Sequence, residues 1–201
     1  MFFRVSDPLL QEISLENEFV RLEPLRLDHL DGLWEASTEE IWDYMPLRVA
    51  HRSEMKQYIQ EANETFACGQ GLGFAVRDPL TEEVVGSTGF WNFVPKNKRI
   101  EIGFTWYAPD RQRTAVNTSC KLLLLTHAFD TLNLNRVEFK TDSLNHRSRA
   151  AIARIGGTEE GTLRAHSIQP DGRLRDSVYF SILKSEWPGV RNRLVSRLAK
   201  A

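Results

Sequence analysis

The stretch from Arg99 to Asn117 combines residue types that suit proton transfer with residue types that suit anion binding. It reads R-I-E-I-G-F-T-W-Y-A-P-D-R-Q-R-T-A-V-N and runs into an apolar helix that we predict from Thr118 to Leu132. Glu101 is a lone carboxylate on a predicted strand, and the polar turn after that strand opens directly into the helix. The first N–H groups of a helix lack intrahelical partners and, with the helix dipole, favour a phosphate. We therefore expect phosphates to bind at the turn and Glu101 to lie near the reacting end of an extended ligand.

The same turn has a purely structural interpretation, in which it is an ordinary entry into a helix. Gln112, Arg113 and Thr114 would then form the entry loop. Asn117 would be a simple N-cap. The turn alone leaves both interpretations open.

Two further polar elements favour a site over an ordinary loop. N-H-R-S, from Asn145 to Ser148, stands at the start of a short predicted helix and presents an amide and a hydroxyl on one helical turn. Taken alone, it could be an N-cap followed by an exposed serine. The third element is Leu163-Arg164, followed beyond a turn by R-D-S-V-Y-F-S-I-L from Arg175 to Leu183.

Composition predicts one globular domain without a membrane span. The 201 residues are 41% hydrophobic and 26% charged with a formal net charge of −1, so no global charge favours nucleic acid or an anionic membrane. Cys68 and Cys120 are too few for a disulfide framework, and the histidines show no metal-ligand spacing, so we expect no metal. Residues Met1 to Pro8 lack the apolar core of a signal peptide, and no segment approaches the roughly 20 apolar residues that span a bilayer. We expect a cytoplasmic protein.

Hydrophobic periodicity predicts helices alternating with strands, in the order β-α-α-β-β-β-α-β-α-β-β. The expected sheet is of mixed direction with helices on both faces. The predicted strands cover residues 19–25, 72–77, 84–93, 100–107, 136–142, 162–168 and 177–183, and the last two form a hairpin around residues 170–172. The predicted helices begin after Asp28, at Ser53, at Thr118 and near His146.

The order and spacing of seven short pieces resemble the GNAT superfamily of acetyl-CoA-dependent N-acetyltransferases, most closely its branch of ribosomal-protein alanine acetyltransferases. The resemblance runs from Asn17 to about Trp187, and its most informative pieces are the last four. The pieces read V-R-L-E-P-L-R-L-D-H-L, V-V-G-S-T-G-F, I-E-I-G-F-T-W, Q-R-T-A-V-N, N-H-R-S, R-I-G-G-T-E-E-G-T-L-R and D-S-V-Y-F-S-I-L-K-S-E-W. The resemblance implies an α/β GNAT fold with about seven strands, splayed between the fourth and fifth. It also implies a single domain over residues 1–201, with a core at about 17–187 and a basic tail at 188–201.

The resemblance also implies which residues bind acetyl-CoA. Main-chain groups of the fourth strand would hold the pantetheine arm, and Asn145 would bond its amide. The family's pyrophosphate loop is Q/R-x-x-G-x-G/A, but here Ala115 and Asn117 stand at the two glycine positions. Glycine allows a backbone to approach a phosphate closely, so binding must tolerate these side chains. The implied contacts are Phe104, Thr105, Trp106, Gln112, Arg113, Thr114, Ala115, Val116, Asn117, Asn145 and Ser148.

The same resemblance assigns the catalytic roles. Glu101 matches the glutamate that serves as base, and Ser148 matches a hydroxyl placed near the CoA sulfur, an acid for the leaving thiolate. The chemistry requires such groups, because an alkylammonium with a pKa near 10 must lose a proton before it attacks a thioester. Trp42 and Tyr44, in a loop that overhangs the acceptor cleft in this family, and Trp91 on a central strand are candidate substrate contacts or core residues.

The sequence therefore predicts an enzyme that acetylates a primary amine, either a protein N-terminus or a small molecule, by direct attack in a ternary complex. The alternative is a non-catalytic acyl-CoA-binding or ribosome-associated module that kept the fold. The substituted glycines favour this alternative slightly, whereas the retained Glu101, Asn145 and Ser148 argue against it. The resemblance is compatible with a homodimer, whereas the near-neutral net charge argues against a nucleic-acid partner.

Overall fold

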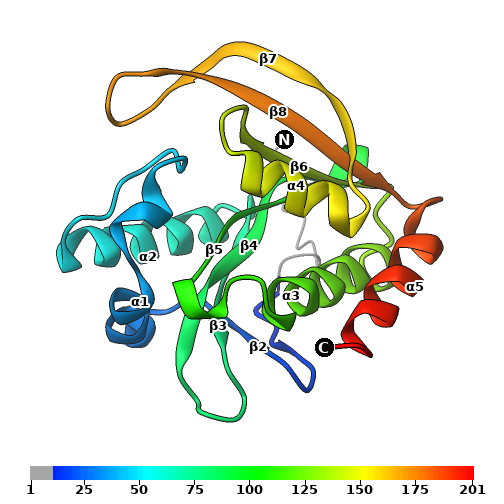
Figure 1. The fold of residues 1–201 in the computed structure, drawn as a ribbon, viewed down its shortest axis with the longest axis horizontal. Helices are drawn as coiled ribbons and strands as arrows, with labels where there is room; N and C mark the ends of the chain where they lie inside the picture. The colour runs from blue at the N-terminus through cyan, green and yellow to red at the C-terminus, as the bar shows by residue number, and fades with distance from the viewer. Residues whose placement is uncertain (1–10) are drawn as a thin grey trace, which may run out of the picture.

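Strands from the whole length of residues 11–201, which the computed structural model describes, join in one mixed sheet (Figure 1). The sheet has eight strands in the order β1-β2-β3-β4-β5-β6-β8-β7. The strands are β1 (Leu15–Glu16), β2 (Arg21–Pro24), β3 (Leu72–Arg77), β4 (Val84–Val94), β5 (Arg99–Tyr107), β6 (Arg136–Asp142), β7 (Thr158–Ile168) and β8 (Leu174–Leu183). The prediction made for Met1 to Pro8 lies outside the described residues.

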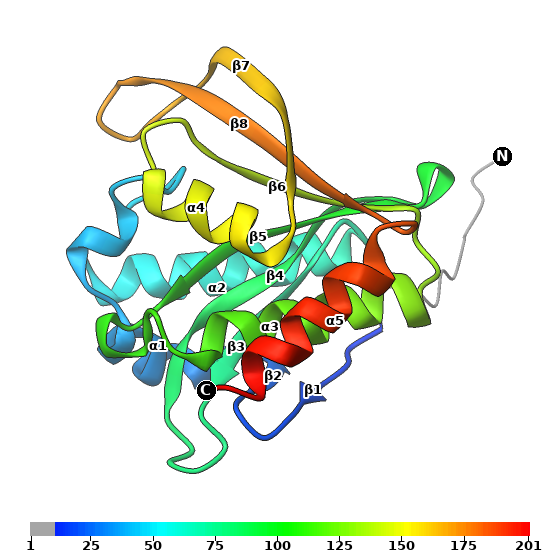
Figure 2. The ribbon, with the colours of Figure 1, turned by 45° about the vertical axis from the view of Figure 1, so that its right-hand side comes forward.

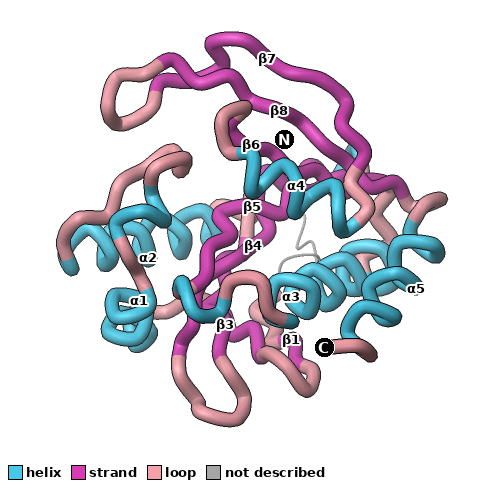
Figure 3. The backbone as a smooth tube through the Cα atoms, viewed as in Figure 1, coloured by secondary structure: helices cyan, strands magenta, loops and turns pink. Residues whose placement is uncertain are grey.

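Helices cover both faces of this sheet, as predicted (Figure 3). The helices α1 (Leu30–Ala36) and α2 (Arg52–Ala67) pack on one face around Trp91 and Trp106. The helices α3 (Ala115–Thr126), α4 (His146–Ile155) and α5 (Trp187–Leu198) pack on the other face around a larger core. Short 3-10 turns at Leu27–His29, Glu39–Trp42, Pro95–Asn97 and Pro109–Arg111 and a π turn at His127–Thr131 complete the described elements.

The sheet opens between β5 and β6. These strands are parallel and pair only over their first three residues, from Arg99 with Arg136 to Glu101 with Glu138. Beyond that point they separate, as the views in Figures 1 and 2 show. On its other side, β5 carries a bulge opposite β4 between Gly103 and Trp106, where Phe104 has a φ of 47°. The predicted splay between the fourth and fifth strands is confirmed; the pair is β5 and β6 because the short β1 adds a strand.

Three element boundaries differ from the prediction. The third helix begins at Ala115 rather than Thr118, because the Thr114 side chain accepts a hydrogen bond from the N–H of Val116 and caps the helix there. That helix also ends in a π turn, so its predicted end at Leu132 lies one residue beyond the turn. The hairpin strands begin earlier than predicted, at Thr158 and at Leu174, since pairing extends over residues that show no apolar pattern.

The residues predicted as a basic tail form the helix α5. Val190 and Leu194 are fully buried against the core, while the side chains of Arg191, Arg193 and Arg197 are exposed. Amphipathic spacing explains this helix, since its apolar stripe packs against α3 while its arginines meet solvent. No helix among the described residues is long and apolar enough to cross a lipid bilayer.

Candidate active site

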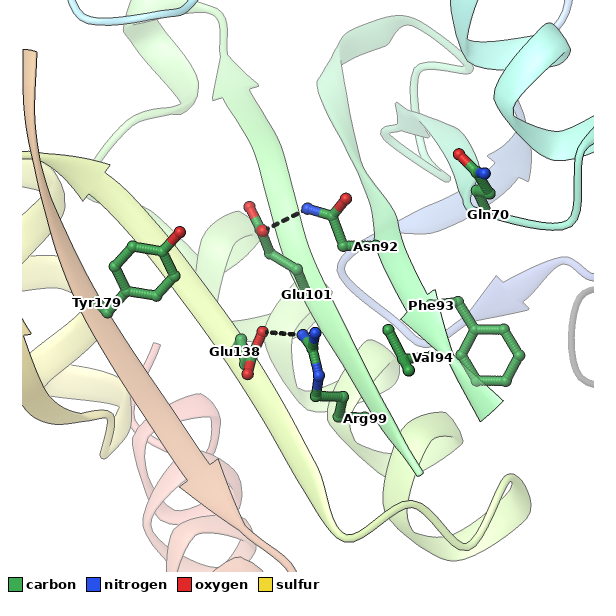
Figure 4. A pocket seen from close by; sticks show the side chains of 8 residues that line it. All are labelled: Gln70, Asn92, Phe93, Val94, Arg99, Glu101, Glu138 and Tyr179. Atoms are coloured by element: carbon green, nitrogen blue, oxygen red, sulfur yellow. Dashed lines mark hydrogen bonds and ion pairs between the residues drawn. The ribbon is translucent and has the colours of Figure 1, made fainter. Parts of the chain in front are cut away.

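Glu101 lies where the pairing of β5 with β6 ends, and its side chain is held through one of its two oxygens; Figure 4 shows the hydrogen bond from Asn92. Asn92 Nδ2 donates a hydrogen bond to Glu101 Oε2 at 2.8 Å, and Lys140 Nζ lies 3.5 Å from the same oxygen. The residue is 6% exposed. Among the described residues, none donates a hydrogen bond to Oε1. One carboxylate oxygen is therefore fixed, and the other is available to accept a proton.

Because Gly103 has no side chain, Glu101 Oε1 can lie close to the backbone at this position. A Cβ atom at this position would lie 3.1 Å from Glu101 Oε1. The carbonyl of Gly103 accepts a hydrogen bond from Trp91 Nε1 at 3.1 Å, which fixes the backbone beside the carboxylate. Glycine here keeps the free oxygen of Glu101 accessible.

A pocket of about 510 Å³ opens in front of Glu101 on the face of the sheet that carries α1 and α2. Strand alternation builds its polar wall, because Val137 and Phe139 of β6 point into the core and Glu138 points into the pocket. Its lining comes from β4, β5, β6, β8 and the turn before β3, and comprises Gln70, Asn92, Phe93, Val94, Arg99, Glu101, Glu138 and Tyr179 (Figure 4).

The β7–β8 hairpin and the segment between α1 and α2 flank this face. In Figures 1 and 2 the hairpin arches over the same side of the molecule as that segment. Tyr44, which is 38% exposed, lies close enough to Arg173 of the hairpin to help raise the pKa of Arg173, whose main cause is a hydrogen bond to Asp142. Tyr44 thus lies near Arg173 of the hairpin, and its contact with a substrate stays a prediction.

Two predicted substrate aromatics lie in the core. Trp42 is 3% exposed and packs between Tyr58 and Trp106, with ring centroids 6.1 and 5.4 Å away. Trp91 is 7% exposed and packs 4.9 Å from the ring of Phe104. Apolar packing on the α1–α2 face buries most of both rings, and their direct contact with a substrate stays a prediction.

The turn before α3 presents backbone donors without strain at the two substituted glycine positions. Ala115 and Asn117 lie within α3, so a methyl and an amide side chain are tolerated there. The residue with a left-handed conformation is Arg113, with a φ of 63°. Gln112 Nε2 donates to the carbonyl of Tyr107 at 3.0 Å and ties the turn to the end of β5. The N-cap is Thr114 and not Asn117.

The start of α4 faces the same turn. Asn145 caps α4, because its Oδ1 accepts a hydrogen bond from the N–H of Ser148 at 2.9 Å. The Arg147 side chain donates to the side chain of Gln112, so the starts of α3 and α4 meet at the open end of the splay. Among the described residues, no hydrogen bond engages Ser148 Oγ. The two polar elements that the sequence singled out are therefore brought together beside the gap between β5 and β6.

Lys121 is a buried cation on α3 that sequence reasoning missed. It is 4% exposed and donates to Thr105 Oγ1 at 2.7 Å and to Thr88 Oγ1 at 3.3 Å. Burial lowers the pKa of Lys121 to about 8. Burial also raises the pKa of the neighbouring Cys120 to about 11, so that thiol is a core residue and not a nucleophile. The signal was a single lysine within an otherwise apolar helix.

Three pocket-side residues were also missed, namely Asn92, Lys140 and Tyr179. Each lies on a strand next to Glu101 or one strand further, and each points to the side that Glu101 faces. The available signal was the polar alternation of E-F-K-T-D in β6 and of S-V-Y-F-S in β8.

Comparison with known proteins identifies the family that carries this geometry. A family model described as an acetyltransferase (GNAT) domain matches residues 20–158. The chain belongs to the GNAT family of acetyltransferases. The predicted resemblance and the prediction of an acetyltransferase enzyme are thereby confirmed.

Relatives of this GNAT chain support the assignment over nearly its whole length. An uncharacterised N-acetyltransferase, p20 of Bacillus licheniformis, is 30% identical over 178 residues, which cover 88% of this chain and 99% of that protein. YdaF of Bacillus subtilis, provisionally named a ribosomal N-acetyltransferase, is 38% identical over 104 residues, which cover 52% of this chain and 56% of that protein. The crystal structure of a GCN5-related N-acetyltransferase from Brucella melitensis matches with a TM-score of 0.88 at 31% identity, over 95% of this chain and 87% of that one.

The GNAT family uses acetyl-CoA, and the residues of this chain fit such a group. Beyond Glu101, the side of β5 that faces β6 has no strand partner, so its backbone groups need other partners. The N–H groups of Arg113, Thr114 and Ala115 make no hydrogen bond within residues 11–201. An extended amide-containing arm ending in phosphates would satisfy both sets of groups.

Proposed function

We propose that this GNAT enzyme moves an acetyl group from acetyl-CoA to a primary amine by direct attack in a ternary complex. The observation that carries the proposal is Glu101, a buried carboxylate with one free oxygen at the apex of the opened sheet. A pocket lies in front of it, and an unpaired strand edge leads away from it.

The donor side of the site is the splay between β5 and β6. Acetyl-CoA would supply an activated acetyl group and leave as a thiol. In our proposal, Phe104, Thr105 and Trp106 hold the pantetheine arm through their main chain, and Asn145 bonds it with its free amide N–H groups. Residues 112–117 receive the pyrophosphate, and the exposed Arg113 adds an ionic contact.

Glu101 is the proposed base. An amine with a pKa near 10 is almost wholly protonated at neutral pH and cannot attack until it loses a proton. Oε1 accepts that proton, directly or through water, while Asn92 and Lys140 hold Oε2 in place.

Ser148 is the proposed acid for the leaving thiolate. Its hydroxyl stands on the first turn of α4, and no described residue engages it in a hydrogen bond. Asn145 fixes this turn by capping it at the Ser148 N–H. The hydroxyl thus stands beside the splay, on the same helical turn as Arg147, whose side chain bonds to Gln112 of the turn before α3.

The proposed acceptor is a protein N-terminus or a small amine that enters from the α1–α2 face. The name of the YdaF relative as a ribosomal N-acetyltransferase favours a protein acceptor over a small amine. The volume of the pocket, about 510 Å³, accommodates one or two residues of a peptide. We also propose that the enzyme acts in the cytoplasm.

A turnover assay tests this proposal. Thiol release from acetyl-CoA is followed with a panel of N-terminal peptides and small primary amines, and the acetylated products are identified by mass spectrometry. We expect amine-dependent thiol release with a matching acetylated product. Binding of acetyl-CoA without turnover on any amine would favour the non-catalytic alternative.

A further inference from the structure

Arg175, on β8, is a buried cation that the proposed reaction does not use. It is 5% exposed, and its Nε has no hydrogen-bond partner among the described residues. Within residues 11–201, no carboxylate oxygen lies within 4.0 Å of its guanidinium. An unpaired charge in the interior costs free energy, so its retention calls for a partner that binds there.

The carboxylate best placed to pair with Arg175 is already engaged. Asp142 Oδ2 accepts from Arg173 at 2.6 Å and from Gln169 Nε2 at 3.3 Å. Its Oδ1 accepts from the N–H of Leu144 at 2.9 Å. Asp142 therefore balances Arg173, and Arg175 retains its donors.

Arg175 faces the acceptor side of the site. Arg175 and Tyr179 are four residues apart on β8, so their side chains leave the same face of the strand, and Tyr179 lines the pocket. Burial lowers the pKa of Arg175, while the charges of Asp142 and Glu101 act in the opposite sense. The guanidinium thus lies within electrostatic range of the proposed base.

We propose that Arg175 binds a carboxylate on the amine acceptor, several bonds away from the amine that reacts. Tyr179 pairs with Lys140, whose Nζ lies 3.5 Å from Glu101 Oε2. Arg175 is four residues, about 13 Å, further along β8. The carboxylate of a free α-amino acid is too close to its amine to bridge that distance. An acidic side chain near the start of a peptide, or a longer amino acid, fits it.

This inference rests on the proposed acetyl transfer. Pairs of acceptors that differ only in a carboxylate test the role of Arg175 independently of whether acetyl transfer occurs. One pair is a peptide beginning Ala-Glu and the same peptide beginning Ala-Gln; the other is 5-aminopentanoate and 1-aminopentane. We expect kcat/KM to be about 10- to 100-fold higher for the acidic member, the range of a hydrogen bond to a charged group. The pair with the larger preference identifies the source of the carboxylate.

The variant Arg175→Met removes the guanidinium and keeps most of the volume, so we expect the acidic preference to fall to about one. The matched control is Arg164→Met, which removes an exposed arginine of the same hairpin and should retain the preference. Equal kcat/KM values within both pairs for the wild-type enzyme would overturn the inference while leaving acetyl transfer intact. If no amine is acetylated, the affinities of the two peptides test the role of Arg175. The inference then requires that the wild-type enzyme bind the acidic peptide more tightly and that Arg175→Met bind both peptides equally.

Discussion

At the scale of single residues, variants of Arg113 and Ala115 distinguish the contribution of charge from that of backbone conformation in the proposed phosphate-binding turn, residues 112–117. Arg113→Ala should weaken acetyl-CoA binding by about 1–2 kcal/mol, because it removes a charged hydrogen bond. The loss should shrink at high salt, since exposed charges are screened. Titration calorimetry at two salt concentrations measures both effects.

The control for that variant is Ala115→Gly. Because Ala115 lies in α3, glycine there should leave acetyl-CoA affinity nearly unchanged and loosen the helix start by up to about 1 kcal/mol. A large gain in affinity instead would mean that the native turn is compromised, and the non-catalytic alternative would then be the better account.

Lys121 gives a residue-scale prediction about stability and pH. Its pKa falls from 10.5 to about 8 on burial, so between these values the unfolded chain binds more protons and stability rises with pH. Cys120 acts in the opposite sense above pH 9, because its pKa rises from 9.0 to about 11. We expect the free energy of unfolding to gain about 1 kcal/mol from the Lys121 titration between pH 8 and 9.

The variant Lys121→Met isolates that contribution. The hydroxyls of Thr88 and Thr105 are 2.7 Å apart and remain paired with each other without the ammonium. Denaturant unfolding at pH 7.5, 8.0, 8.5 and 9.0 should show a gain in the wild type that the variant lacks. If the free energy of unfolding changed with pH in the same way in both proteins, the pKa of Lys121 would not be lowered in the folded state.

At the scale of elements, one buried carboxylate holds the turn end of the β7–β8 hairpin. β8 pairs with β6 and buries Val178, Phe180 and Ile182, but β7 is exposed along almost its entire length and adds few apolar contacts. The Asp142 side chain is fully buried and pairs with Arg173 near the hairpin turn. Burial would raise the pKa of Asp142, but hydrogen bonds from Arg173 and the Leu144 N–H outweigh it and lower that pKa below 3.8. Its contribution is therefore present at neutral pH and is lost only as the pH falls through the lowered value.

Asp142→Asn should release the hairpin without unfolding the helices behind the sheet. We expect a loss of about 1–3 kcal/mol, the cost of breaking charged hydrogen bonds to a buried group. Amide hydrogen exchange should accelerate in β7 and the turn before β8 and stay slow in α3. Uniform acceleration across the protein would show that Asp142 supports the whole fold and not this hairpin in particular.

The elements themselves were largely predictable from the sequence, but the contacts around Glu101 were not. Hydrophobic periodicity located β3, β4, β5, β6 and α4 closely, because each buries an apolar face. It missed the start of α3, where a Thr114 cap decides the boundary, and the starts of β7 and β8, whose residues show no apolar pattern. Asn92 reaches Glu101 from a neighbouring strand through a left-handed φ of 50°, and periodicity carries no information on such a bend. Trp42 lies in a loop by sequence, yet tertiary packing buries it.

At the scale of the whole molecule, we expect bound acetyl-CoA to link the two halves of the sheet, which meet at the short pairing between β5 and β6. β5 and β6 share three residue pairs, whereas the proposed ligand would contact β5, α3 and α4 at once. A ligand that binds only the folded state stabilises it by about 2.7 kcal/mol at one hundred times its Kd. We expect a rise in Tm with acetyl-CoA concentration, measured by scanning calorimetry; no shift at millimolar concentration would contradict the donor site.

The homodimer that the resemblance allows stays a prediction, which analytical ultracentrifugation tests.

The central claim is that Glu101 takes the proton from the attacking amine, and Glu101→Gln tests it most directly. Glutamine keeps the shape and can still bond to Asn92, but it cannot serve as a base. We predict that kcat falls by roughly one hundred-fold or more, the scale of general-base catalysis, while the Kd for acetyl-CoA and the Tm stay close to those of the wild type. Wild-type activity of the variant across pH 6 to 9 would contradict the account, because Glu101 would then be structural and another group or solvent would be the base.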